Sequence, residues 1–133
     1  MTAIDSYSHG VSGEREFGFA QAIKVDHTIY VSGQLSHDDE GDFLYPGDFD
    51  AQTAQVFANF EKVLAHYGAT RNQVVSETQY IVDLPKYNNA MAAANLAYFG
   101  DHRPTSSTIG VAHLFFPGQL IETNFIIDTR LPA

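Results

Sequence analysis

The chain has 133 residues, a formal net charge of −9 and no cysteine. The length fits one domain, and the lack of cysteine excludes disulfides, thiol catalysis and thiolate metal sites. The seven basic residues are scattered, which disfavours nucleic acid as a partner. No segment has the pattern of a signal peptide or a membrane span. We therefore expect a single domain over residues 1–133 in the cytoplasm, with neither nucleic acid nor a membrane as partner.

The first third of the chain predicts a flexible lead-in followed by a hairpin. Residues 1–13 are polar and rich in Gly and Ser, which is typical of a mobile terminus. The segments 17–25 and 27–32 suit two strands joined by a tight turn. Gly33, at the end of the second strand, permits a bend or the close approach of another group. The acidic loop 35–50 lacks the spacing of a calcium-binding loop, so we expect no metal there.

The middle of the chain predicts a helix, a strand and a second helix. Apolar residues recur at helical spacing over 50–67, with Asp50 as the expected N-cap and Gly68 as the stop. Residues 74–82 are rich in β-forming residues, and Asp83 is expected to cap the helix that follows. The apolar face of the first helix consists of Ala54, Phe57, Phe60, Val63, Leu64 and Tyr67.

Residues 103–129 predict two further strands joined by a tight turn at Pro117 and Gly118. Glu122 lies in the second of these strands among apolar residues. A carboxylate in such surroundings must be hydrogen-bonded, ion-paired or protonated. Burial also tunes its pKa for general-base chemistry. Glu122 is therefore the most informative residue of the chain, either as a general base or water-positioning group or as a structural carboxylate bonded to backbone amides.

The predicted order of elements is β-β-α-β-α-β-β, which indicates an α+β fold with a mixed sheet and two helices packed on one face. Two helices cover only one face of such a sheet. The apolar density of the last two strands leaves too little polarity for an open second face. We therefore expect self-association, in the simplest case into a closed ring.

Four motifs along the chain are similar to those of a known family. They are FGFAQ at 17–21, VSGQ at 31–34, HYGAT at 66–70, and RPTSSTIGV followed by LIET near the C-terminus. In this order and spacing the chain resembles the Rid family, the reactive-intermediate deaminases, also called YjgF-like proteins. The resemblance implies a chorismate-mutase-like fold and a homotrimer with small-molecule clefts between its subunits. It also implies hydrolysis of reactive enamines and imines to keto acids without any cofactor.

The resemblance also assigns site residues. Glu122 corresponds to the family glutamate that positions or activates the attacking water, and Ser32 matches the archetype. Phe19 stands where archetypes usually have tyrosine, so the shape is kept and the hydroxyl is lost. The substrate-binding positions implied by the resemblance are Phe19, Ser32, Gly33, Ser106 and Thr108.

Ser106 is the main departure from the family pattern. Archetypal deaminases carry an arginine there, which clamps the substrate carboxylate, and a hydroxyl cannot replace its bidentate geometry. The chain therefore resembles the subfamilies that lack this arginine. Arg15 is a candidate substrate-binding replacement over the cleft, with a surface salt bridge to Glu14 or Glu16 as the alternative. Strand parity points Arg103 away from the Ser106 side.

These observations predict a cofactor-free hydrolase or deaminase that acts on an imine, an enamine or a related metabolite, but not an archetypal 2-iminopropanoate deaminase. A ligand-binding or regulatory protein without chemistry is the first alternative, motivated by the missing arginine. Endoribonuclease activity is the second, and the charge of −9 disfavours it. The six histidines show no paired spacing for zinc. His113 is expected on a strand near the cleft, as a core or interface residue or as a proton shuttle.

Overall fold

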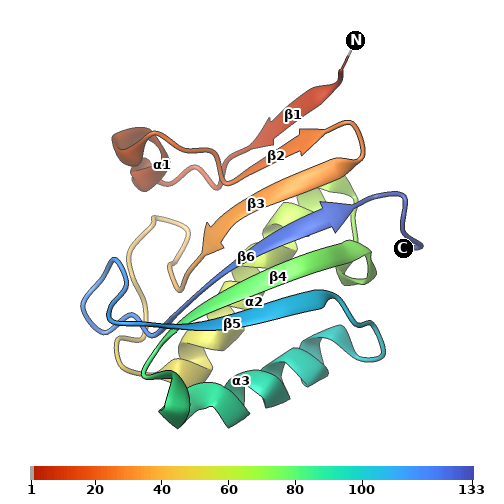
Figure 1. Ribbon diagram of the computed structural model, residues 1–133. Coiled ribbons are helices and arrows are strands. Elements are labelled where there is room, and N and C mark those ends of the chain that lie inside the picture. The colour runs from red at the N-terminus through yellow and green to blue at the C-terminus, as the bar shows by residue number, and fades with distance from the viewer. Residues whose placement is uncertain (1) are drawn as a thin grey trace.

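The computed structural model describes residues 2–133 as a six-stranded sheet with two long helices on one face (Figure 1). The strands are β1 Ile4–Tyr7, β2 Ala22–Val25, β3 Thr28–Gln34, β4 Val74–Val82, β5 Thr105–Val111 and β6 Ile121–Asp128. The helices are α1 Ser12–Phe17, α2 Phe49–Tyr67, the 3₁₀ turn η1 Arg71–Gln73, and α3 Leu84–Phe99. The sheet order is β1-β2-β3-β6-β4-β5, with β4 and β5 parallel and the other described pairs antiparallel. This architecture confirms the predicted α+β fold with a mixed sheet.

The core lies between the sheet and α2. Ile121, Phe125 and Ile127 of β6 are buried toward the helices, at the spacing of two that a strand requires. The ring of Phe60 in α2 stacks on that of Phe125, with centroids 3.7 Å apart. Most of the predicted apolar face of α2 is buried, namely Phe57, Phe60, Val63 and Leu64, whereas Ala54 is exposed.

No described element covers the second face of the sheet. Tyr30 of β3 is 53% exposed, Ile109 of β5 is 42% exposed and Ile126 of β6 is 38% exposed. Tyr30 pairs with Ile126 across the sheet, so these two side chains are neighbours. Large apolar side chains that gather on a surface mark an interaction site. Self-association through this open face stays a prediction.

The N-terminal segment differs from the prediction. Residues 4–7 form an edge strand paired with β2 instead of a flexible lead-in. The strand expected over 17–25 is reduced to β2, because α1 extends as far as Phe17. The Tyr7 ring packs against the His66 ring of α2, with centroids 4.8 Å apart. Such tertiary contacts order the segment, and local composition does not reveal them. The predicted β2–β3 hairpin is confirmed.

α2 has a different N-cap residue from the predicted one, whereas α3 begins directly after Asp83, as predicted, but without the expected side-chain cap bond. α2 starts at Phe49, and the side chain of Asp48, not that of Asp50, accepts a hydrogen bond from the Ala51 N–H at 3.1 Å. Asp83 has a φ of 58° and makes no side-chain cap bond to α3. Propensity alone does not choose between two aspartates two residues apart, because both are favourable caps. Within residues 2–133, no helix is long and apolar enough to cross a membrane.

The last two strands do not form the predicted hairpin. β4 lies between them, parallel to β5 and antiparallel to β6. α3 is the crossover that makes β5 parallel to β4, and the connection 112–120 then leads to the other side of β4. Pro117 and Gly118 lie in this connection. The Gly118 carbonyl accepts hydrogen bonds from the Gly47 N–H and the Gln52 side chain, which anchors the connection at the start of α2.

Candidate functional site

An apolar cavity of about 410 Å³ lies at the end of the sheet where β3 ends and β6 begins. α1, the loop 35–48 and the connection 112–120 gather at this end, on the left of Figure 1. We call it the aromatic cavity, because its walls include Phe17, Phe19, Phe115 and Phe116. The predicted site residues that line it are Phe19, Ser32, Gly33 and Glu122.

Glu122 lies directly against the backbone of Gly33. The register between β3 and β6 shifts between Val31 and Gln34, which marks an irregularity at the predicted bend. A Cβ atom at Gly33 would lie 2.5 Å from Glu122 Oε2, closer than nonbonded atoms approach. Glycine therefore leaves the space that the carboxyl group occupies. Both properties predicted for Gly33, a bend and a close approach, are present.

The surroundings of Glu122 favour its protonated form more than water does. Burial raises the pKa of this carboxyl, and a hydrogen bond with Gln119 opposes that shift without cancelling it. In the described part of the chain no basic side chain forms an ion pair with Glu122. A half-buried carboxyl with a raised pKa can take a proton from water and return it to a substrate.

Ser32 presents hydrogen-bond acceptors to the aromatic cavity. Its hydroxyl group donates its hydrogen to the carbonyl of Ala20 at 2.6 Å. The lone pairs of the hydroxyl oxygen therefore remain available for a ligand or a water molecule. Phe19 precedes Ala20 and forms part of the wall, with 42% of its surface exposed. This wall combines one acceptor with an aromatic ring.

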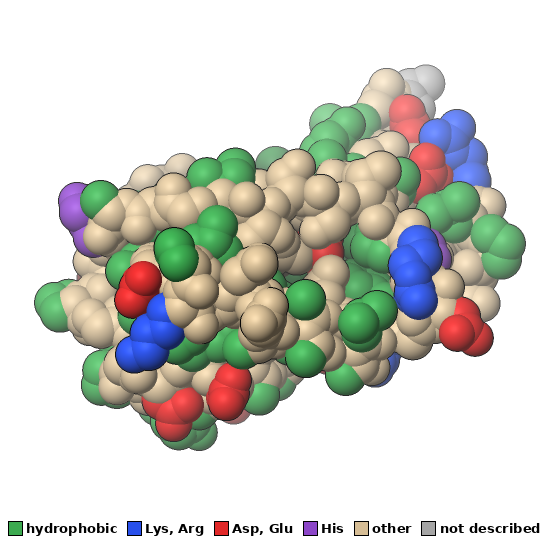
Figure 2. Space-filling model, turned by 60° about the horizontal axis from the view of Figure 1, so that its bottom comes forward, with side chains coloured by type: hydrophobic (Ala, Val, Ile, Leu, Met, Phe, Trp, Pro, Cys, Tyr) green, Lys and Arg blue, Asp and Glu red, His purple; other side chains and the backbone are tan. Residues whose placement is uncertain are grey.

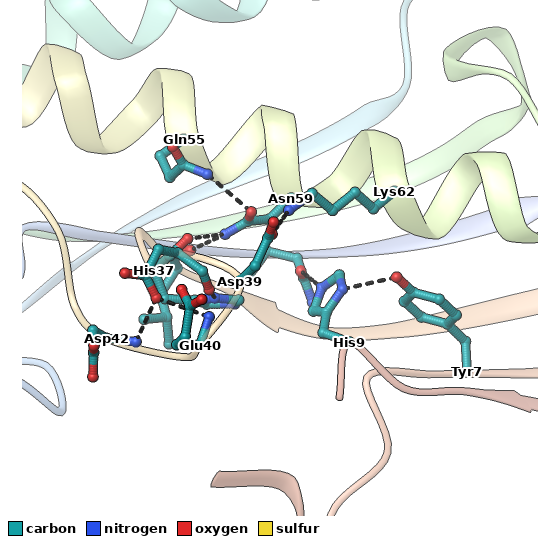
Figure 3. A network of polar contacts seen from close by, with 12 residues as sticks. Tyr7, His9, His37, Asp39, Glu40, Asp42, Gln55, Asn59 and Lys62 are labelled. Atoms are coloured by element: carbon teal, nitrogen blue, oxygen red, sulfur yellow. Dashed lines mark hydrogen bonds and ion pairs between the residues drawn. The ribbon is translucent and has the colours of Figure 1, made fainter. Parts of the chain in front are cut away.

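The loop 35–48 forms another wall and is held on α2 (Figure 3). The side-chain amide of Asn59 donates to the carbonyl of His37 at 3.2 Å. Lys62, one helical turn further on, pairs with Asp39. His37 itself lines the aromatic cavity. The buried hydrogen bond from Asn59 fixes this wall more than the exposed ion pair between Lys62 and Asp39 does, because exposed ion pairs contribute little to stability.

Ser106 and Thr108 lie in a different cavity, also of about 410 Å³, between α3 and β5, which we call the α3–β5 cavity. Figure 2 shows the hollowed surface on this side of the molecule. Ser106 and Thr108 pair with Glu77 and Gln79 of β4, whose side chains are buried toward the helices. Glu122 alternates with buried residues of β6 and lies on the opposite face of the sheet. A single chain therefore does not bring Ser106 and Thr108 together with Glu122.

Glu77 was not singled out by sequence analysis and is only 1% exposed. Its Oε1 atom accepts hydrogen bonds from Gln79 Nε2 at 2.6 Å, from Ser106 Oγ at 3.0 Å and from the Asn95 side chain. Burial raises the pKa of Glu77, and these hydrogen bonds oppose the shift. The sequence contained a signal for Glu77, because it lies among β-forming residues in the segment 74–82. A carboxylate in such a strand requires hydrogen-bond or ion-pair partners, as for Glu122.

Three other candidate residues lie outside the expected places. Arg15 is exposed on α1, is not among the residues that line the aromatic cavity, and forms no ion pair within residues 2–133. Arg103 lines the same cavity as Ser106, and its Nη1 atom donates to the carbonyl of His102 at 3.0 Å; strand parity does not apply to it, because β5 begins at Thr105. His113 is exposed in the connection after β5 and lines neither cavity.

Among the described side chains, no group of three His, Asp or Glu residues is placed to hold a metal ion.

A family model described as Endoribonuclease L-PSP matches residues 3–128. The chain belongs to this family, which is also called the YjgF or Rid family. The match covers nearly the whole chain and confirms the resemblance seen in the four sequence motifs.

Individual Rid family members show the same relationship. A RutC family protein of Pyrococcus abyssi is 35% identical over 96 residues, which are 72% of this chain and 75% of that protein. The 3-aminoacrylate deaminase RutC of Acinetobacter baylyi is 31% identical over 104 residues, covering 78% of this chain and 81% of that protein. The crystal structure of a YjgF family member from Mycobacterium tuberculosis superposes with a TM-score of 0.83 at 25% identity, over 95% of this chain and 99% of that chain.

Proposed function

We propose that the chain is a cofactor-independent hydrolase that deaminates an imine, an enamine or a related metabolite. The observation that carries the proposal is Glu122, a half-buried carboxyl with a raised pKa and no cationic partner in the described chain, beside an apolar cavity of about 410 Å³. The relative named 3-aminoacrylate deaminase supports the reaction type, because 3-aminoacrylate is an enamine.

Glu122 serves as the proton-transfer group in this reaction. It removes a proton from a water molecule as the water oxygen attacks the imine carbon, and it returns this proton to the nitrogen, which gives a carbinolamine. Glu122 then takes the proton of the carbinolamine hydroxyl group and passes it to the nitrogen. The C–N bond breaks, ammonia leaves, and the carbonyl forms. An enamine reaches the same route after it takes up a proton at carbon. Ser32 accepts a hydrogen bond from the attacking water or from the substrate nitrogen.

The complete cleft lies between two copies of the chain in this proposal. Glu122 and the pair Ser106 and Thr108 lie on opposite faces of one sheet, so one chain cannot present them to the same ligand. The family resemblance implies clefts between the subunits of a homotrimer. We propose that the aromatic cavity of one copy faces the α3–β5 cavity of the next, and that the open sheet face packs inside the trimer.

The test is a measurement of ammonia release, over the rate in buffer, from imines generated in place by an amino-acid oxidase and by an amine oxidase. These substrates differ in whether they carry a carboxylate. We expect acceleration of at least one imine with an apolar side chain. Glu122→Gln should lower kcat by about 100-fold or more, which is the usual contribution of a general base.

Glu16→Gln is the matched control, because Glu16 is exposed and lines neither cavity. It should leave kcat unchanged. Full activity in Glu122→Gln would contradict the mechanism. Saturable ligand binding without turnover across the panel would favour a non-catalytic binding protein, which the absence of the family arginine at Ser106 also suggests. Endoribonuclease activity is a weaker candidate, since the net charge of −9 opposes RNA binding.

A further inference from the structure

The hydroxyl groups of Ser106 and Thr108 point their hydrogens away from the α3–β5 cavity. Ser106 Oγ donates to Glu77 Oε1 at 3.0 Å, and Thr108 Oγ1 donates to Gln79 Oε1 at 2.8 Å. Each hydroxyl has one hydrogen and two lone pairs. Because both hydrogens are used beneath the surface, each oxygen offers only lone pairs to the cavity.

Glu77 fixes the directions in which Ser106 and Thr108 donate their hydrogen bonds. A carboxylate only accepts hydrogen bonds, so the Gln79 amide turns its Nε2 toward Glu77 Oε1, at 2.6 Å. The carbonyl oxygen of Gln79 is then left to accept from Thr108. The chain of donors therefore runs from Thr108 through Gln79 to Glu77, and Ser106 joins it directly. It cannot reverse while Glu77 is ionised.

Within residues 2–133, two further acceptors in this cluster have no hydrogen-bond partner. They are Glu77 Oε2 and Asn95 Oδ1, which are both buried. They belong to adjacent side chains, because the Asn95 amide nitrogen donates to the other oxygen of Glu77. Asn95 also lines the cavity, together with Ser106 and Thr108. The cluster beneath the cavity thus has an excess of acceptors over donors, so it favours a ligand group that brings positive charge or N–H donors to the hydroxyl oxygens above it.

Arg103 is a cation that lines the same cavity, but it is exposed and lies in the connection between α3 and β5. Its Nη1 atom donates to the carbonyls of Gly100 and His102. Its guanidinium group is therefore anchored to main-chain carbonyls after α3. It has no hydrogen bond to the acceptor cluster around Glu77.

We propose that the Ser106–Thr108 end of the cleft binds an N–H donor of the ligand, in particular an amine or ammonium group, and rejects a carboxylate. A carboxylate there would face the lone pairs of both hydroxyls and the charge of Glu77. An ammonium group would meet the lone pairs of Ser106 and Thr108 above the buried carboxylate of Glu77. The inference rests on the proposed function in one respect, since it takes the α3–β5 cavity to be one end of the ligand cleft.

The test is isothermal titration calorimetry at pH 7.5 with two probes, 2-phenylethylamine and phenylacetate. Both carry a phenyl ring for the aromatic cavity, and they differ in the charged group. We expect the amine to bind at least tenfold more tightly than the acid. Glu77→Gln and Thr108→Val, which keep the side-chain shapes, should each weaken amine binding at least fivefold. Asp50→Asn also removes one negative charge, but from an exposed site outside both cavities, and should change nothing.

The outcomes separate this inference from the proposed function. Tighter binding of phenylacetate, or amine binding that is unchanged in both cavity variants with intact circular dichroism spectra, overturns the inference alone. Binding of neither probe together with normal ammonia release also overturns it alone. Binding of neither probe together with no ammonia release from any imine removes both the inference and the proposed function.

Discussion

Glu77 is buried and Glu122 is half-buried, but the surroundings of the two carboxyl groups suit different roles. Glu122 of β6 touches the backbone of Gly33 and opens to an apolar cavity, so its proton can be exchanged with a ligand. Glu77 of β4 receives three hydrogen bonds on one oxygen and lies beneath Ser106. Burial raises the pKa of both groups. We assign proton transfer to Glu122 and the orientation of neighbouring hydroxyls to Glu77.

Restoring the family arginine should fail while Glu77 is present. Ser106 is directly opposite Glu77 in the parallel register, so the guanidinium group of Ser106→Arg should pair with Glu77 and not with a substrate carboxylate. We expect no gain of 2-iminopropanoate hydrolysis in Ser106→Arg, and at least a tenfold gain in Ser106→Arg combined with Glu77→Thr. Ammonia release measures both, and Glu77→Thr alone is the control. A gain of the same size in the single Ser106→Arg variant would show that Glu77 does not compete for the guanidinium group.

The raised pKa of Glu77 also predicts how stability depends on pH. Between the unfolded and the folded pKa, the folded state binds more protons, so the contribution of Glu77 to stability falls as pH rises and is lowest above the folded pKa. Glu77→Gln cannot ionise, and its amide supplies donors beside the unpartnered Asn95 Oδ1. We expect the Tm of Glu77→Gln to exceed that of the wild type by a few degrees at pH 8 and by less at pH 4.5. Scanning calorimetry at both values, with the exposed Glu16→Gln as control, measures this. A Tm difference of equal size at both pH values would refute it.

At the scale of elements, the sequence predicted the two long helices, β3 and β4 well, because their periodicity is strong and local. It missed β1, which is ordered by pairing with β2 and by packing of Tyr7 on α2. It also joined β5 and β6 in a hairpin, since the apolar pattern of a strand does not identify its neighbour in the sheet. Arg103 was misplaced for a related reason, because parity applies within a strand and Arg103 lies outside β5. The candidate site residues were chosen by motif similarity, and their division between two cavities follows from topology.

The start of α2 gives a direct test at this scale. Asp48→Ala removes the side-chain bond to the Ala51 N–H and should lower the free energy of unfolding by about 1 kcal/mol. Asp50→Ala is the matched control, because Asp50 lies exposed in the first turn and only interacts with the helix dipole, which is worth about 0.3–1 kcal/mol. Urea unfolding measures both. A larger loss in Asp50→Ala would mean that the helix begins where the sequence alone predicted.

At the scale of the whole molecule, the sheet separates the two cavities, which the proposed function treats as the two halves of one cleft. The helices protect one face, and the other exposes Tyr30, Ile109 and Ile126. A closed ring of copies could bury this apolar face and complete the cleft in one step. Activity and assembly should therefore be lost together, although neither cavity touches Ile126.

Tyr30→Asp tests this link between assembly and activity. It places a charge on the open face next to Ile126, where burial of an unpaired carboxylate is costly. We expect the wild type to show three times the mass of one chain by light scattering, and Tyr30→Asp to shift toward the mass of a single chain with at least a tenfold loss of ammonia release. Tyr45→Asp is the control, since Tyr45 is similarly exposed, at 47%, but lies in the loop 35–48. A single-chain wild type that still releases ammonia would place the whole reaction in the aromatic cavity, with no part for Ser106 and Thr108.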